Sequence, residues 1–213
     1  MTIIEQITQA GVVPVIKLNH PERDAVPLAK ALVEGGLPVA EVTFRASGAP
    51  LAIRLMLEAY PSMLVGAGTV LTTVQVDQAL EAGVKFIVTP GMDQEIVQYC
   101  QEKGVPVFPG CTSATDYHTA FKLGLEILKF FPAEQSGGLA KIKALSAPFS
   151  MFRIMPTGGI NLNNLAEYLS CPAVCACGGS YMVTEALIER QSWEEITRLS
   201  QQSVAIVKEV RHG

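Results

Sequence analysis

The segment ILKFFPAE, residues 127–134, places a lysine inside an apolar stretch. Moving a charged amine out of water is costly, so burial favours its uncharged form. A lysine in an apolar pocket can therefore be a free amine at neutral pH, which attacks a ketone and forms a Schiff base. The iminium withdraws electrons, so that a neighbouring carbon–carbon bond can break or form. Lys129 is accordingly a candidate nucleophile.

Glu41 lies in a second apolar segment, VAEVTF, residues 39–44. Lys129 and Glu41 are the two ionisable residues that lie inside the apolar segments, away from their ends. A carboxylate beside the Schiff base would move protons, directly or through a water molecule. The alternative is a buried Lys129–Glu41 ion pair without chemistry, and such a pair is weak evidence for stability. Placement inside strands favours the chemical interpretation.

Three further features are candidates for binding anions. Arg45 ends the segment of Glu41, and its planar fork suits a carboxylate or a phosphate, although a solvated arginine is equally compatible. The segments PTGGI and CGGSY end in glycine pairs, whose bare backbone N–H groups suit a phosphate. The alternative for each glycine pair is a tight turn. Two such pairs in corresponding places favour phosphate binding.

Other motifs carry weaker implications. GAGT, residues 66–69, lacks the third glycine of a dinucleotide fingerprint. Its small residues leave room for substrate, with Thr69 as a hydrogen-bond donor, or serve helix–strand packing. The cysteines in CPAVCAC have no partner ligands at zinc spacing, so we interpret them as small buried hydrophobic residues. No G-x-S-x-G motif is present. We expect neither a metal nor a cofactor.

Eight short apolar segments recur along the chain and must position these residues. Each is nearly continuous in its hydrophobicity, as expected of parallel strands that are covered on both faces. They comprise residues 12–16, 39–44, 64–69, 86–90, 105–110, 127–132, 153–159 and 173–180. The candidate residues lie within these segments or at their carboxyl ends, which is where parallel α/β folds place their active sites.

Segments with helical spacing lie between the apolar ones. They are ERDAVPLAKALVEGG, TTVQVDQALEAG, DQEIVQYCQEKG, TDYHTAFKLG, NLNNLAEYLS and WEEITRLSQQSVAIVKEV. We expect Gly35 to follow the first helix and Thr72 or Thr73 to cap the second. The alternation predicts an α/β fold, a (β/α)8 TIM barrel formed by residues 1–213 as a single domain. A doubly wound sheet is the alternative, but the first strand ends in VIKLNHPE without glycine.

Composition limits the possible partners. The net charge of −4 argues against nucleic acid. No apolar stretch approaches the length of a membrane helix, and the amino-terminal segment with Glu5 does not resemble a signal peptide. Five cysteines, an odd number, indicate a reducing cytoplasm. Only 17% of the residues are charged, which favours association into an oligomer.

The motifs together resemble one enzyme family. EVTFR, GAGTVL, TPG, PGCTSATD, KFFPAE, PTGGI and GGS follow the order and spacing of the bacterial 2-keto-3-deoxy-6-phosphogluconate (KDPG) aldolases, which also act as 4-hydroxy-2-oxoglutarate (KHG) aldolases. The resemblance covers nearly the whole chain. It implies a class I aldolase of the Entner–Doudoroff pathway, a cytoplasmic homotrimer that acts on keto acids and phospho-sugar acids.

The resemblance also implies roles for particular residues. Lys129 resembles the Schiff-base lysine and Glu41 the proton-transfer residue of the family. Binding roles follow for Arg45 and Thr69 (pyruvate carboxylate), Thr157 (substrate hydroxyl), Phe131 (pocket wall), Pro90 (pyruvate end), and Gly158, Gly159, Gly179 and Ser180 (phosphate).

Lys17 departs from the family pattern, which has an apolar residue there; contact with substrate and exposure to solvent are both compatible with the sequence. Arg45 and Thr157 favour the gluconate-type substrate over the galactonate-type one. Two other functions stay open. A phosphosugar isomerase or epimerase would use Glu41 as a base and Lys129 as an electrostatic partner, and a non-catalytic sensor would bind sugar phosphate without turnover.

Overall fold

The computed structural model describes residues 1–212 and contains strands in all eight predicted segments. Several strands are shorter than the predicted segments, at one end or at both. The strands are β1 (Val12–Ile16), β2 (Val39–Thr43), β3 (Leu64–Gly68), β4 (Ile87–Val88), β5 (Val107–Phe108), β6 (Ile127–Phe130), β7 (Arg153–Pro156) and β8 (Cys177–Gly179).

All six predicted helical segments contain helices, and further helices occur where the pattern analysis named none: α1, α3, α7 and α9. A capping box of Thr2 and Glu5 begins α1, a sequence feature that the analysis missed. The helices are α1 (Ile3–Ala10), α2 (Pro21–Glu34), α3 (Ala49–Ala59), α4 (Thr73–Glu81), α5 (Gln94–Glu102), α6 (Ala114–Lys122), α7 (Gly138–Ser146), α8 (Leu165–Leu169), α9 (Glu185–Glu189) and α10 (Trp193–His212).

Two details of the helix ends bear on the predictions. Thr72 caps α4, as expected, and its side chain accepts a hydrogen bond from the amide of Gln75. Gly35 follows α2, as expected, but it is the cap residue with right-handed backbone angles, and Gly36 takes the left-handed C′ position with φ of 75°. Glycine pays no steric penalty in that conformation, which explains Gly36.

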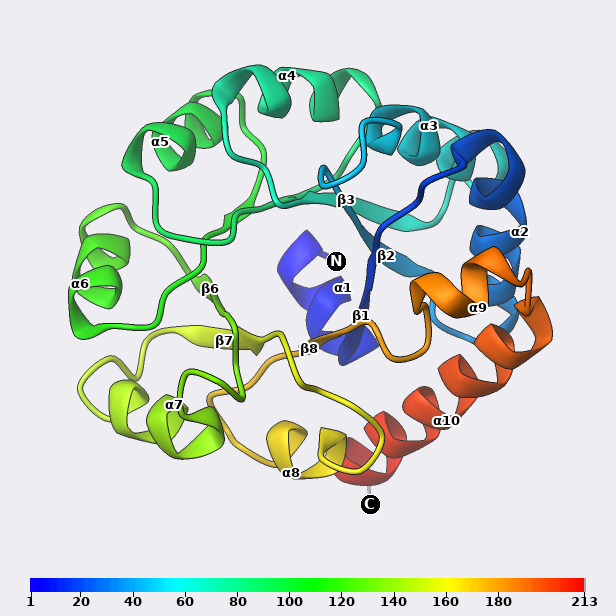
Figure 1. Ribbon diagram of the computed structural model, residues 1–213. Helices are drawn as coiled ribbons and strands as arrows, with labels where there is room; N and C mark the ends of the chain where they lie inside the picture. Colours follow the sequence, from blue (N-terminus) through cyan, green and yellow to red (C-terminus); the bar gives the residue numbers. More distant parts are fainter. Residues whose placement is uncertain (213) are drawn as a thin grey trace.

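The strands form a curled parallel sheet with helices outside it (Figure 1). Continuous pairing runs through six strands in the order β5-β4-β3-β2-β1-β8, and β6 pairs with β7. Single parallel bridges, Gly110 to Lys129 and Thr157 to Gly178, connect the two groups at their edges. The parallel, alternating part of the prediction is therefore confirmed.

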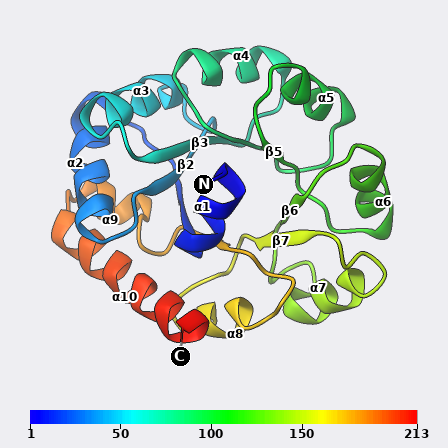
Figure 2. The same cartoon turned by 180° about the vertical axis from the view of Figure 1, so that it is seen from behind.

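The core lies between the sheet and the surrounding helices and inside the curl of the sheet. β1 is buried along its whole length, as are β2 and β3. α1 lies at the centre of the ring of helices and leads directly into β1, so it covers the end at which the strands begin (Figure 2). The carboxyl ends of the strands are left for a site. Within the described residues, no helix has the length and apolar character needed to cross a membrane.

Candidate active site

Lys129 and Glu41 form a buried ion pair inside the curled sheet. The Lys129 Nζ atom lies 3.2 Å from Glu41 Oε1, and the two side chains are 5% and 0% exposed. Lys129 is held at the backbone, where its amide donates to Pro109 and its carbonyl accepts from Cys111. Strands β6 and β2 thus bring together two residues that are far apart in the sequence.

The second carboxylate oxygen of Glu41, Oε2, is buried and has no hydrogen-bond partner within the described residues. A buried carboxylate oxygen without a partner is costly, and it usually marks a place where a ligand or a proton is received. The Glu41 carboxylate also lies close enough to the Lys129 amine for a proton to pass between them. The geometry of the pair therefore permits proton transfer.

Glycines in β3 make room for this arrangement. A Cβ atom added to Gly68 would lie 2.2 Å from Glu41 Oε1, and one added to Gly66 would lie 2.3 Å from the ring of Phe86. Such contacts are far shorter than van der Waals distance. The small residues of GAGT therefore accommodate the Glu41 carboxylate and an aromatic core residue, which corrects the interpretation that they leave room directly for substrate.

A cavity of about 360 Å³ opens above the pair, at the carboxyl ends of the strands. All eleven residues proposed from the sequence line it: Glu41, Arg45, Thr69, Pro90, Lys129, Phe131, Thr157, Gly158, Gly159, Gly179 and Ser180. Gly178, the first glycine of the CGGSY pair, also lines the cavity, as do Val15, Thr43 and Ile160, for which no role was predicted. Thr43 lies between Glu41 and Arg45 in the sequence, and that position could have revealed it.

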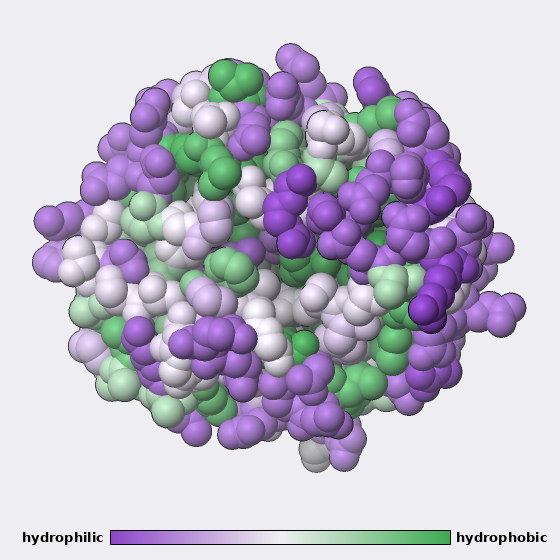
Figure 3. Space-filling model, viewed as in Figure 1, coloured by the Kyte–Doolittle hydropathy of each residue, from purple (hydrophilic) through white to green (hydrophobic). Residues whose placement is uncertain are grey.

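The surface around the cavity differs in polarity from its surroundings. Apolar and weakly polar residues gather near the hollowed centre of this face, and hydrophilic residues surround them (Figure 3). Two of the charged residues that line the cavity, Glu41 and Lys129, are buried, so they act in a largely desolvated setting.

Arg45 is oriented by Thr43. The Thr43 hydroxyl donates to the carbonyl of Ile16 at 2.8 Å and accepts from Arg45 Nε at 3.2 Å. This leaves the terminal nitrogens of the guanidinium as the pair that suits a planar carboxylate. Thr43 is therefore a positioning residue that sequence analysis did not assign.

Thr69 has an unusual backbone conformation, with φ of 54°. A β-branched residue in the left-handed region is a real outlier that costs about 1–3 kcal/mol, and such strain clusters at ligand sites. Here it places the hydroxyl-bearing residue that follows β3 at the cavity wall. The strain supports a binding role for Thr69.

Glycine residues line the cavity at the end of β7 and at the end of β8. Gly158 and Gly159 have φ of 100° and 82°, which only glycine adopts readily. The Gly158 carbonyl accepts from the amide of Glu134, and the Gly159 carbonyl accepts from two asparagine side chains, whereas within residues 1–212 their own amides donate no hydrogen bond. Backbone N–H groups left in this way form an anion-binding concavity.

Gly178 and Phe131 complete the cavity around Thr157 and Lys129. A Cβ atom at Gly178 would lie 2.3 Å from the Thr157 hydroxyl, so glycine at this position leaves room for the Thr157 side chain. The Lys129 ammonium lies 5.1 Å from the centroid of the Phe131 ring, within the range of a cation–π contact. The ring forms a wall beside the amine.

The cysteines lie away from this chemistry. All five are buried free thiols. Burial raises the pKa of Cys175 to about 11 and that of Cys100 to about 12, so both stay protonated at neutral pH. Their interpretation as small buried hydrophobic residues is confirmed. The described residues contain no group of three or more His, Cys, Asp or Glu side chains that is placed to hold a metal ion.

A parallel α/β fold with a buried lysine and glutamate facing a cavity is the arrangement expected of an enzyme that forms Schiff bases. Comparison with known proteins makes this more specific, since residues 3–199 match the family described as KDPG and KHG aldolase. The chain is 47% identical over 207 residues to the 2-dehydro-3-deoxy-phosphogluconate aldolase of Treponema pallidum, covering 97% of this chain and 98% of that one. It is 39% identical to the KHG/KDPG aldolase of Escherichia coli, covering 93% and 92%.

A solved structure agrees with these relatives. The KDPG aldolase of Legionella pneumophila, captured with pyruvate as a covalent carbinolamine, superposes with a TM-score of 0.90 at 38% identity over 94% of this chain and 97% of that chain. This chain belongs to the KDPG and KHG aldolase family.

Proposed function

We propose that this chain is a class I aldolase that cleaves 2-dehydro-3-deoxy-6-phosphogluconate to pyruvate and glyceraldehyde 3-phosphate. The observation that carries the proposal is the buried Lys129–Glu41 pair at the floor of a cavity lined by anion-binding groups. The L. pneumophila relative with pyruvate bound as a carbinolamine supports covalent chemistry at a lysine. Cleavage of 4-hydroxy-2-oxoglutarate to pyruvate and glyoxylate is the second expected activity, in keeping with the E. coli relative.

The first half of the reaction forms the Schiff base. Glu41 takes a proton from the Lys129 ammonium, and the free amine attacks C2 of the keto acid to give a carbinolamine. Glu41 then returns its proton to the carbinolamine hydroxyl, which leaves as water, so that a protonated imine remains and Glu41 is again a carboxylate. Arg45 and Thr69 hold the neighbouring carboxylate, which fixes C2 over the amine. Phe131 and Pro90 bound the pyruvate end of the cavity.

The second half breaks the carbon–carbon bond. Glu41 accepts the proton of the C4 hydroxyl, directly or by way of a water molecule, and the electron pair of the C3–C4 bond moves into the iminium to give an enamine. Thr157 binds a substrate hydroxyl, and Gly158, Gly159, Gly179 and Ser180 hold the phosphate. Glyceraldehyde 3-phosphate leaves. Protonation of the enamine at C3 and hydrolysis then release pyruvate and restore Lys129.

The fold and assembly expected from the sequence belong to the same proposal. We infer a single domain in which the strands close into an eight-stranded barrel, supported by the parallel bridges from Gly110 to Lys129 and from Thr157 to Gly178. A homotrimer in the cytoplasm is proposed on the resemblance to the family and on the low charged fraction of 17%.

The direct test is release of pyruvate from each substrate, followed with lactate dehydrogenase and NADH. The proposal predicts cleavage of the gluconate-derived substrate in preference to its galactonate-derived epimer. Glu41→Gln should lower kcat by about 10² to 10⁴-fold, because a general acid–base is lost. Isomerised sugar phosphate without pyruvate would instead support the isomerase or epimerase alternative.

A further inference from the structure

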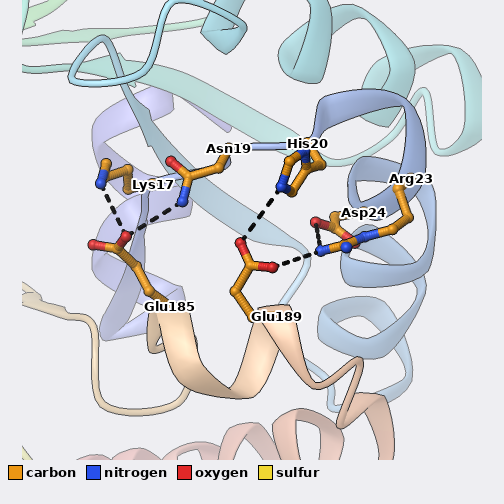
Figure 4. A network of polar contacts seen from close by, with 7 residues as sticks. All are labelled: Lys17, Asn19, His20, Arg23, Asp24, Glu185 and Glu189. Carbon is orange, nitrogen blue, oxygen red and sulfur yellow. Dashed lines mark hydrogen bonds and ion pairs between the residues drawn. The ribbon is translucent and has the colours of Figure 1, made fainter.

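Lys17 lies just beyond the end of β1 and forms an ion pair with the first residue of α9. Its ammonium donates to Glu185 Oε2 at 2.9 Å, and the Asn19 side chain donates to the same oxygen at 3.4 Å (Figure 4). The side chains of Lys17 and Glu185 are 29% and 52% exposed. An ion pair with this much exposure is worth little to stability, so its partners can be exchanged at little cost.

Lys17 and Glu185 are not among the residues that line the cavity, but the strand register brings them to its glycine end. β1 runs beside β8, with Pro14 aligned with Gly179. Side chains alternate along a strand, so Lys17 leaves β1 on the same side as Val15, which lines the cavity. The Glu185 partner begins the helix that follows Gly179 and Ser180 by a few residues. The pKa of Glu185 is lowered chiefly by the hydrogen bond from Lys17, and the charge of Arg45, another cavity residue, adds to it.

The distribution of charge in the cavity leaves a role for Lys17. Among the lining residues of the described chain, the cations are Arg45 and Lys129, which the proposed mechanism uses for the carboxylate and for the Schiff base. The glycine end offers neutral backbone amides and the Ser180 hydroxyl. A phosphate dianion bound there would lie beside the ammonium of Lys17, and charge-assisted hydrogen bonds to phosphate are stronger than neutral ones.

We propose that Lys17 is a specificity-determining residue that leaves Glu185 and binds the phosphate of the substrate. The inference rests on the proposed function, since it assumes a substrate with a distal phosphate. In the empty site, Glu185 holds the Lys17 ammonium near the place where it would bind phosphate. When substrate binds, Glu185 competes with the phosphate for this ammonium. The pair therefore favours phosphorylated over unphosphorylated sugar acids.

A structural brace is the competing explanation. Glu189 of the same helix accepts from Arg23 at 3.1 Å and lies 3.9 Å from His20, so α9 is held against the start of α2 by neighbouring contacts (Figure 4). A brace and a binding residue differ in one respect. Removing either member of a brace has the same effect, whereas removing Glu185 would free Lys17 for the phosphate.

The experiment compares Lys17→Met, Glu185→Gln and the control Lys30→Met. Lys30 forms an exposed ion pair with Glu34 on α2, with 3.7 Å between Nζ and Oε1. Each variant is assayed with 2-dehydro-3-deoxy-6-phosphogluconate and with its unphosphorylated counterpart. Lys17→Met should raise KM for the phosphorylated substrate about tenfold, the loss of one charge-assisted hydrogen bond, with kcat and the unphosphorylated reaction unchanged. Glu185→Gln should lower that KM, and Lys30→Met should leave it unchanged.

Three results would overturn the inference. Lys17→Met could have the same kinetics as Lys30→Met, or it could lose activity toward the phosphorylated and the unphosphorylated substrate to the same extent. The third is an increase in KM for the phosphorylated substrate in Glu185→Gln. Trapping with pyruvate and borohydride is run on each variant and on the wild type. An adduct on Lys129 throughout separates failure of this inference from failure of the proposed function, which would show as no adduct in the wild type.

Discussion

Two lysine–glutamate pairs in this protein have similar nitrogen–oxygen distances, but one pair is buried and the other is exposed. Lys129 and Glu41 are separated by 3.2 Å in the interior, where the side chains are 5% and 0% exposed. Lys17 and Glu185 are separated by 2.9 Å at the surface, where the side chains are 29% and 52% exposed. The Lys17–Glu185 pair has the shorter distance but contributes less to stability, because water and salt screen its charges.

The comparison shows that burial, more than the nitrogen–oxygen distance, determines what an ion pair can do. Burial makes the inner pair costly, and among residues 1–212 the Glu41 Oε2 atom has no hydrogen-bond partner, so a proton or a substrate can stabilise it. The outer pair loses little when it opens. We therefore assign covalent chemistry to the inner pair and ligand selection to the outer one.

The largest expected effect is on turnover. Lys129→Ala should lower kcat by roughly 10⁵-fold or more, because no other group replaces the nucleophile. Pyruvate release in the lactate dehydrogenase assay measures it, with Lys30→Ala as the matched surface variant. Turnover within tenfold of wild type in Lys129→Ala would mean that the inner pair is structural.

The inner pair should also dominate stability. Lys129→Met leaves the Glu41 carboxylate buried without its cation and should lower the free energy of unfolding by about 3–5 kcal/mol. The double variant Lys129→Met with Glu41→Gln should recover much of that loss, since no uncompensated charge stays in the interior. Urea unfolding followed by circular dichroism measures each value. Equal stability of Lys129→Met and Lys17→Met would remove the distinction between the pairs.

Gly68 tests the space that the inner pair needs. Gly68→Ala would place a methyl group 2.2 Å from Glu41 Oε1 and displace the carboxylate. A misplacement of this size should lower kcat by about 10²-fold. Gly91→Ala is the control, because an added Cβ atom meets nothing within 4 Å there. Similar kcat values for the two variants would show that the position of Glu41 is not critical.

The smallest expected effect concerns the outer pair and acid. Lys17 lowers the pKa of Glu185 below its ordinary value of 4.5, so the folded state holds this carboxylate charged more readily than the unfolded state does. Its contribution to stability is present above pH 4.5 and is lost as the pH falls through the lowered pKa. The difference in unfolding free energy between wild type and Glu185→Gln should therefore shrink in acid. A difference that grows in acid would contradict the assignment.

Much of the fold could be predicted from local patterns. The eight apolar segments contain the eight strands because parallel strands covered on both faces are hydrophobic throughout. α7 was missed because it begins at Gly138, directly after Gly137, and glycine is a poor helix former. The strain at Thr69 and the hydrogen bond from Arg45 to Thr43 depend on contacts between neighbouring strands, which local patterns do not contain.

The candidate site was predictable to the extent that its residues are out of place in the segments that carry them. Lys129 and Glu41 are charged residues in apolar strands. Each glycine pair at a strand end has more glycine than a tight turn alone requires. The role of Gly68 was not predictable, because it depends on where the carboxylate of a neighbouring strand points. Lys17 was left between two interpretations for the same reason, since its partner is 168 positions away.

The most direct test of the central assignment is borohydride trapping with pyruvate, followed by mapping of the modified peptide by mass spectrometry. Reduction of the imine should leave a pyruvate-derived mass on Lys129 and on no other lysine. Folded protein that gains no adduct, or that gains it at a different lysine, would contradict the assignment of the buried amine as the nucleophile.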